Sequence, residues 1–179
     1  MRAPVKYLLA ICLAGVFLFF ALNVLFPIVY KIKEPCFAIP VEIDSASERG
    51  VLPIRNDAWG EGLFNAKRSG GRRHKGLDLR ARIKSPVYAS KSGWARSCDF
   101  PGGYGNLVII NHPGRWQTRY GHLDKSVIKG FQWVRQGEII GFVGKTGNAD
   151  LKGITPHLHF EIRYKGKPAD PAPFLVKQR

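Results

Sequence analysis

Residues 155–163 read TPHLHFEIR, and this stretch decides the fold. His157 and His159 alternate there with the apolar residues Leu158, Phe160 and Ile162. Successive side chains of a β-strand point to opposite faces, so the run predicts a strand with two imidazoles on one face and an apolar core on the other. A solvated face that carries histidine by chance and a metal site both produce this pattern. Other parts of the chain decide between these two interpretations.

Short alternating runs bounded by glycine fill the chain from Trp59 onward. Examples are SPVYAS, NLVIINH and EIIGFVG, which begin at Ser85, Asn106 and Glu138. Strand-length runs separated by turn residues are typical of β-proteins. We find no amphipathic helix of useful length and no internal repeat in this part. The expected fold is therefore mainly β, an antiparallel sheet of barrel or sandwich type in which residues 157–164 form a central strand.

An uncharged apolar segment at residues 7–30 precedes this domain. It contains 24 residues, and roughly 20 are enough to cross a bilayer as a helix. Basic residues lie on both sides of it, so the flanking charge gives no orientation. A cleavable signal peptide is the alternative, but signal peptides usually have a shorter apolar core and a small-residue cleavage site. No clean site follows here, so we expect one retained transmembrane helix.

The expected organisation has five parts: an N-terminus at 1–6, a transmembrane anchor at 7–30, a stalk at 31–58, a folded domain at 59–175 and a tail at 176–179. The stalk assignment rests on prolines, charges and the lack of periodic signals in that region. Cys36 and Cys98 either pair, if the domain faces an oxidising compartment, or remain free thiols. Cys12 lies within the apolar segment.

The formal net charge is +15 on 179 residues. A surface of this charge attracts polyanions, which include nucleic acids, anionic lipids and acidic cell-wall polymers. The chain has no long basic helix and no aromatic platform in a recognisable nucleic-acid motif. No nucleic-acid partner is therefore expected.

Four of the five histidines fall in three short clusters. The first is HKGLD, where His74 and Asp78 flank Gly76, whose missing side chain permits a tight backbone. The second is RYGHLD, which holds His122, and the third is the strand at 157–164. His, Asp and His plus an open position describe a catalytic zinc site, whereas a closed structural site would add a fourth ligand, usually cysteine. Each cluster alone is ordinary, but together they favour a hydrolytic metal site. His112, in NHPGR, is interpreted as a turn residue and not as a ligand.

These motifs resemble those of a known family. HKGLD, YGHL and HLHFEI, in this order, are similar to the LytM/lysostaphin-type zinc peptidases, the M23 family of cell-wall endopeptidases. The likeness continues in SPVYASKSGWA, GGYGNLVIINHPG, VRQGEIIGFVGKTGN and KGKPADPAPFL, and it covers about residues 59–175. The chain departs from the family at FNAKR, where Asn65 replaces the glycine of an FGxR-like segment.

The resemblance implies a site and a reaction. His74, Asp78 and His159 match the family's zinc ligands, and His122 and His157 match its two catalytic histidines. By this likeness, the protein hydrolyses peptide cross-links of bacterial peptidoglycan through a zinc-activated water. The cofactor it implies is Zn²⁺.

Four further residues keep two interpretations each. Glu161 shares a face with the strand histidines, where it either orients an imidazole or is a solvated carboxylate. Arg72, Arg73 and Arg119 lie near the motifs in sequence. They either contact carboxylates of the substrate or form part of a general basic surface.

The implied substrate also indicates a location. Peptidoglycan lies outside the bacterial plasma (inner) membrane, so a single-pass chain would keep residues 1–6 in the cytoplasm and expose its domain to the periplasm or cell exterior. The basic surface suits anionic wall polymers. One alternative is a catalytically silent protein of the same fold that regulates another cell-wall hydrolase, although such proteins usually lose ligands. A second is a lipoyl/biotin-carrier hairpin at VRQGEIIGFVG, which would give no reason for the four histidines.

Overall fold

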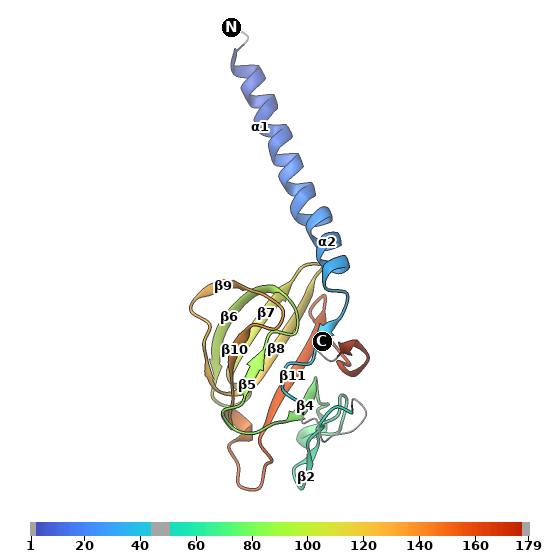
Figure 1. Cartoon of the computed structure of the whole chain (residues 1–179), viewed down its shortest axis with the longest axis vertical. Helices are drawn as coiled ribbons and strands as arrows, with labels where there is room; N and C mark the ends of the chain where they lie inside the picture. The colour runs from blue at the N-terminus through green and yellow to red at the C-terminus, as the bar shows by residue number, and fades with distance from the viewer. Residues whose placement is uncertain (1–2, 44–50, 177–179) are drawn as a thin grey trace. The chain divides into compact units, whose positions relative to one another are not determined.

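The computed structural model describes residues 3–43 and 51–176, and the chain divides into two compact units between Pro35 and Cys36. The first unit is helical and contains α1 (Ala3–Phe20), the π-helical turn η1 (Ala21–Leu25) and α2 (Phe26–Lys33) (Figure 1). Residues 7–33 are long and apolar enough to cross a bilayer, a test that a signal sequence also passes. Asn23 donates its side-chain amide to the carbonyl of Phe19 at 2.9 Å, which satisfies that polar group within the helix.

The second unit is built on one antiparallel sheet, as the sequence predicts. Its strands are β4 (Leu77–Arg80), β5 (Pro86–Tyr88), β6 (Gly93–Phe100), β7 (Gly105–His112), β8 (Trp116–Ser126), β9 (Phe131–Val134), β10 (Ile139–Val143), β11 (His157–Tyr164) and β12 (Lys167–Ala169). Along the sheet the order is β12, β11, β8, β7, β6 and β9, with β4 also paired to β11. The long β8 pairs β10 through its second half, and β10 pairs β5. Strand β11 thus has neighbours on both sides.

Smaller elements complete this unit. They are β1 (Phe37–Ala38), β2 (Asn56–Asp57), β3 (Gly60–Glu61), β13 (Leu175–Val176) and the 3₁₀ turns η2 (Ser69–Gly71), η3 (Gly147–Ala149) and η4 (Ala172–Phe174). Strands β2 and β3 form a short antiparallel hairpin, whereas β1 and β13 pair in parallel.

The two faces of β11 have different neighbours. Leu158, Phe160 and Ile162 are fully buried in the hydrophobic core, which Val87 of β5 and Ile140 of β10 also line. The opposite face carries two histidines and a glutamate, as the alternation predicts, but it is not a solvated face. These polar side chains are buried as well. Such burial requires hydrogen-bond partners for every polar atom, and it concentrates the chemistry of the chain on that face.

Residues 36–43 and 51–58, which we expected to belong to a stalk, are part of the folded unit. Phe37 and Ala38 form β1, and Phe37, Ile39 and Val41 lie in the core. Their alternation is that of a strand, which the neighbouring prolines had obscured. The folded unit therefore begins near residue 36 instead of 59. Residues 1–2 of the expected N-terminus, 44–50 of the expected stalk and 177–179 of the expected tail lie outside the described residues.

His112 is a buried strand residue and not a turn residue. Its Nδ1 lies 2.9 Å from the carbonyl of Ser92, and its Nε2 lies 2.8 Å from the hydroxyl of Thr118. Both ring nitrogens are therefore occupied by hydrogen bonds, which agrees with the expectation that this histidine is not a ligand. Cys36 and Cys98 are free thiols in the structure.

Phe37 provides a test of the new domain boundary. A buried phenylalanine replaced by alanine typically costs about 3–5 kcal/mol of stability. We expect Phe37→Ala to lower the free energy of unfolding by about 3 kcal/mol, measured by chemical denaturation of the full chain in detergent. Val51→Ala, at an exposed position, is the control and should change it by less than about 0.5 kcal/mol. Equal stability of Phe37→Ala and wild type would restore the stalk interpretation.

Candidate metal centre

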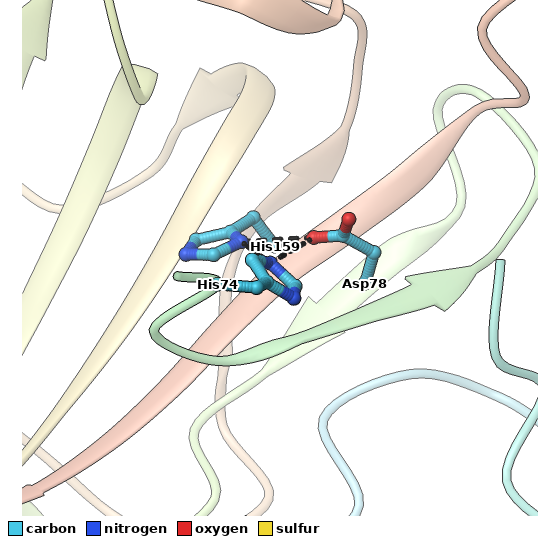
Figure 2. Close-up of side chains that lie close together, drawn as sticks. All are labelled: His74, Asp78 and His159. Carbon is cyan, nitrogen blue, oxygen red and sulfur yellow. Dashed lines mark hydrogen bonds and ion pairs between the residues drawn. The ribbon is translucent and has the colours of Figure 1, made fainter. Parts of the chain in front are cut away.

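Three side chains converge on the polar face of β11, as Figure 2 shows. They are His74, Asp78 and His159, and all three are buried. The atoms that meet are Nε2 of His74, Oδ1 of Asp78 and Nδ1 of His159. They form a triangle with sides of 2.9–3.0 Å.

The register between β4 and β11 builds two corners of this triangle. Asp78 lies directly opposite His159, while the next pair, Leu79 and Leu158, points into the core. Gly76 permits the turn that carries His74 to approach β11. A Cβ atom at Gly76 would collide with the backbone carbonyl of Phe160. HKGLD therefore needs its glycine for a close approach between two backbones.

A second hydrogen bond orients each histidine of the triangle. Nδ1 of His74 donates to the carbonyl of Leu63 at 2.8 Å, because a carbonyl can only accept. Nε2 of His159 lies 3.2 Å from a carboxylate oxygen of Glu161 and donates to it. With a cation in the triangle, its two nitrogens and the carboxylate oxygen of Asp78 would each present a lone pair.

Three lone pairs this close repel one another unless a proton or a metal ion lies between them. Zinc bonds of about 2.0–2.2 Å in tetrahedral geometry would separate the ligand atoms by roughly 3.3 Å. The observed sides of 2.9–3.0 Å are slightly shorter than this. Two imidazole nitrogens and one carboxylate oxygen are also the donor types that zinc takes. The residues present therefore fit a zinc ion.

Two arginines hold the other oxygen of Asp78. Oδ2 accepts from Arg55 at 3.0 Å and from Arg68 at 3.1 Å, which leaves Oδ1 for the triangle. Arg55 is buried and also donates to Asp57 at 2.6 Å. The other oxygen of Asp57 accepts from the backbone N–H of Thr155, just before β11. The segment that we had expected to be a stalk thus supports a corner of the site, and no sequence signal indicated it.

The pKa values around the triangle reflect this arrangement. Without a metal ion, protons supply the positive charge inside the triangle. Burial would raise the pKa of Asp78, but hydrogen bonds from His159 and His74 then hold it well below its usual range. Burial lowers the pKa of His159, yet its bonds to Asp78 and Glu161 outweigh burial and raise the pKa to about 9. The carboxylates of Asp78 and Glu161 are therefore charged at neutral pH.

Two more histidines flank the triangle. The ring centroids of His122 and His157 lie 5.1 Å apart, and that of His122 lies 5.8 Å from the ring of His159. Their Nδ1 atoms donate to the carbonyls of Thr146 and Thr155 at 2.9 and 2.7 Å. Burial lowers the pKa of His122 to about 3 and also lowers that of His157. Both rings are neutral, and Nε2 is the lone-pair nitrogen of each.

The position of His122 depends on an unusual backbone. Strict alternation along β8 would send it into the core, because Tyr120 is a core residue and Gly121 pairs with His159. His122 instead has a φ of 61°, in the left-handed region. The register of β8 against β7 shifts between Tyr120 and Leu123, and its register against β10 shifts just beyond, between Leu123 and Lys125. This break in the strand turns the imidazole toward the site, and no sequence pattern had indicated it.

Glu161 is fully buried, which favours the orienting role over a solvated carboxylate. Besides His159, it accepts from the hydroxyl of Tyr104 at 2.6 Å and from Arg163 at 2.7 Å. Burial would raise its pKa, but these three donors lower it to about 2. Carboxylates behind a histidine fix its tautomer and raise its basicity toward a metal. The sequence had not indicated the parts of Tyr104 and Arg163.

An open cleft of about 1070 Å³ contains all five predicted site residues. Arg72 and Arg73 line it, whereas Arg119 lies beside it, with its guanidinium 5.9 Å from the centre of the Tyr104 ring. Asn65 also lines the cleft and has a φ of 63°. Asparagine adopts this conformation more readily than most residues other than glycine, so the departure from the FGxR-like pattern retains the backbone shape.

Comparison with known proteins agrees with the geometry. Residues 72–171 match the family model described as Peptidase family M23. The chain is 38% identical over 150 residues to the cell division protein DipM of Caulobacter vibrioides, an alignment that covers 78% of this chain and 24% of that protein. It is also 38% identical over 97 residues to the peptidoglycan DD-endopeptidase ShyB of Vibrio cholerae, covering 54% of this chain and 22% of ShyB. The chain thus spans about a quarter of the length of these curated relatives.

A solved structure has a similar fold. It is a zinc-containing peptidase from Vibrio cholerae, 34% identical in sequence, with a TM-score of 0.58. The match covers 76% of this chain and 39% of that one.

Proposed function

Because the chain belongs to peptidase family M23, we propose that it is a membrane-anchored zinc metallo-endopeptidase that hydrolyses the peptide cross-links of bacterial peptidoglycan. One observation carries this proposal. Three atoms of the types that zinc takes, two imidazole nitrogens and one carboxylate oxygen, meet within 3.0 Å in a cleft that also contains two neutral histidines.

In this proposal His74, Asp78 and His159 hold the zinc ion, and the cleft leaves a further position open for substrate and water. When bound, zinc supplies a Lewis acid that polarises the scissile carbonyl and lowers the pKa of a water molecule. Arg55 and Arg68 keep the carboxylate of Asp78 charged and correctly turned. Glu161 holds the ring of His159 so that Nδ1 points toward Oδ1 of Asp78, where zinc would bind.

His122 and His157 move the protons. A peptide bond is a poor electrophile, so the attacking water must be aimed and deprotonated. The Nε2 atoms of these two rings can accept that proton, because each Nδ1 already donates to a backbone carbonyl. Once protonated, either ring can stabilise the negative charge of the tetrahedral intermediate and protonate the leaving amine.

Peptidoglycan is the substrate that the relatives favour, since ShyB is named as a peptidoglycan DD-endopeptidase. The chemistry of the cleft supports this choice. Arg72 and Arg73 line the cleft, and the stem peptides of peptidoglycan carry several carboxylates. The formal charge of +15 also suits a wall that contains anionic polymers.

The apolar helix at residues 7–33 supports a single-pass anchor in the plasma membrane. The domain would then face the periplasm or cell exterior, where the wall lies. A reporter that is active only outside the cytoplasm, fused after Arg179, should be active. A start near residue 35 in the purified protein would instead identify a cleaved signal peptide.

The alternative, a catalytically silent protein that regulates another wall hydrolase, predicts that a site residue is missing or displaced. All five are present and assembled in one cleft. Digestion of purified peptidoglycan by the full chain, with mass spectrometry of the fragments, separates the two functions. Binding without any cleavage would favour the silent alternative.

We expect one zinc ion per chain, bound through His74, Asp78 and His159. His159→Ala should lose most of this zinc in elemental analysis of the purified protein. His112→Asn is the matched control, because it also changes a buried histidine but lies outside the triangle. Equal zinc contents in His159→Ala and wild type would contradict the ligand assignment.

Replacement of His122 should remove catalysis and leave the metal. His122→Asn is the suitable variant, because asparagine tolerates the left-handed backbone at this position. We expect zinc content and melting temperature close to wild type, with hydrolysis slower by about 10²–10⁴-fold, the usual contribution of a positioned acid–base group. Wild-type digestion of peptidoglycan by this variant would reduce His122 to a structural residue.

A further inference from the structure

The sheet face that carries the site continues well beyond the cleft. Cross-strand partners point to the same side of a sheet, so the register identifies which side chains share this face. One row runs from β11 across β8, β7 and β6 to β9 and contains Glu161, Arg119, Ile109, Arg96 and Phe131. The row beside it contains Arg163, Gln117, Asn111, Trp94 and Trp133. Figure 1 shows these strands side by side.

The far end of both rows is an aromatic platform, formed by the exposed Trp94 and Phe131 and the half-buried Trp133. The rings of Trp94 and Phe131 are stacked, 5.0 Å apart and 8° from parallel, and Trp133 meets Trp94 edge-on at 5.6 Å. Trp94 is 45% exposed and Phe131 64% exposed. Contiguous exposed apolar surface often marks a binding site. A ligand that covers these rings removes apolar surface from water, which is favourable.

Polar side chains connect the platform to the cleft. Arg96 and Asn111 are exposed beside the aromatic rings. The amide of Gln117 donates to Asn111 at 2.8 Å and accepts from Arg119 at 2.9 Å. Arg119 in turn lies over the ring of Tyr104, which lines the cleft. The path from β11 to β9 crosses four strand spacings, roughly 19 Å in all.

This sequence of groups fits a saccharide better than a peptide or a lipid. The faces of a pyranose ring present C–H groups, which pack on the electron-rich faces of aromatic rings. Its hydroxyl and N-acetyl groups hydrogen-bond to amide and guanidinium side chains. A peptidoglycan peptide is attached to a saccharide strand. A peptide that occupies the cleft therefore brings its own saccharide close to the same face.

We propose that the platform of Trp94, Phe131 and Trp133 is a binding site for the saccharide strand of peptidoglycan. The inference rests on the proposed function, since it assigns a second part of the same substrate to a second part of the same face. The platform holds the polymer while the cleft acts on its peptide. It raises affinity for the intact wall and takes no part in bond cleavage.

The test uses the full chain in a detergent without a sugar head group and two ligands. The first is a soluble oligomer of N-acetylglucosamine, whose binding is followed by calorimetry and tryptophan fluorescence. The second is a cross-linked peptide without sugar, whose turnover is followed separately. Trp94→Ala should weaken oligomer binding by about tenfold, the loss of one aromatic stacking contact. Turnover of the sugar-free peptide should not change.

Two further variants keep the result unambiguous. Phe131→Ala removes a largely exposed ring with less effect on folding, and it should weaken oligomer binding by roughly threefold. Tyr164→Ala removes an aromatic side chain that is 41% exposed and pairs with Trp116, on the opposite face, and it should bind like wild type.

Unchanged oligomer binding by both Trp94→Ala and Phe131→Ala overturns the inference and leaves the platform as a contact surface for a protein. Equal losses in Tyr164→Ala would also overturn it, because the effect would not be specific to this face. Failure of the wild-type chain to cleave the sugar-free peptide counts against the proposed function. Peptide cleavage and saccharide binding are measured in separate assays, so failure of the proposed function can be distinguished from failure of this inference.

Discussion

The antiparallel register between β4 and β11 is the constraint on which the core and the polar site both depend. It places Asp78 opposite His159 on one face and Leu79 opposite Leu158 on the other. Because side chains alternate, a slip by one residue would send the carboxylate into the core and the leucines into the cleft. The burial of Leu158, Phe160 and Ile162 therefore holds the site geometry as firmly as it holds the fold. Gly76 adds to this constraint, since the third corner depends on its close approach to β11.

Charge balance is the second condition for such a site. Asp78 and Glu161 are buried carboxylates, and burial of an uncompensated charge is costly. Each has one oxygen directed at the histidines and another held by arginine, from Arg55 and Arg68 in one case and Arg163 in the other. The arginines allow the carboxylates to stay ionised. They also leave Oδ1 of Asp78 and Oε1 of Glu161 free to contact the histidines. The same division recurs in the histidines, where one nitrogen faces a backbone carbonyl or carboxylate and the other faces the site.

Sequence patterns predicted those parts of the structure that depend on residues close together in the chain. The alternation in HLHFEI and the glycine in HKGLD were enough to predict a strand and a His–Asp–His group, because both depend on residues two to four apart. The contribution of residues 36–58 could not be predicted in this way. Strand β1 has only two residues and pairs with the opposite end of the domain, and Arg55 reaches Asp78 across 23 positions. The left-handed backbone of His122 could not be predicted either, because it depends on the place where β8 stops pairing with β11 and begins to pair with β10.

The wide separation of partners along the chain has a consequence for biosynthesis. The two histidines of the triangle are 85 positions apart, and β1 pairs with the final strand, β13. A ribosome delivers the first partners long before the last ones, so neither the triangle nor the sheet around it can close on a partial chain. Topologies dominated by such distant contacts also fold slowly, since the loops must close before the contacts stabilise them. An unfinished or prematurely ended polypeptide therefore lacks the assembled triangle, which needs a residue from the last fifth of the sequence, His159.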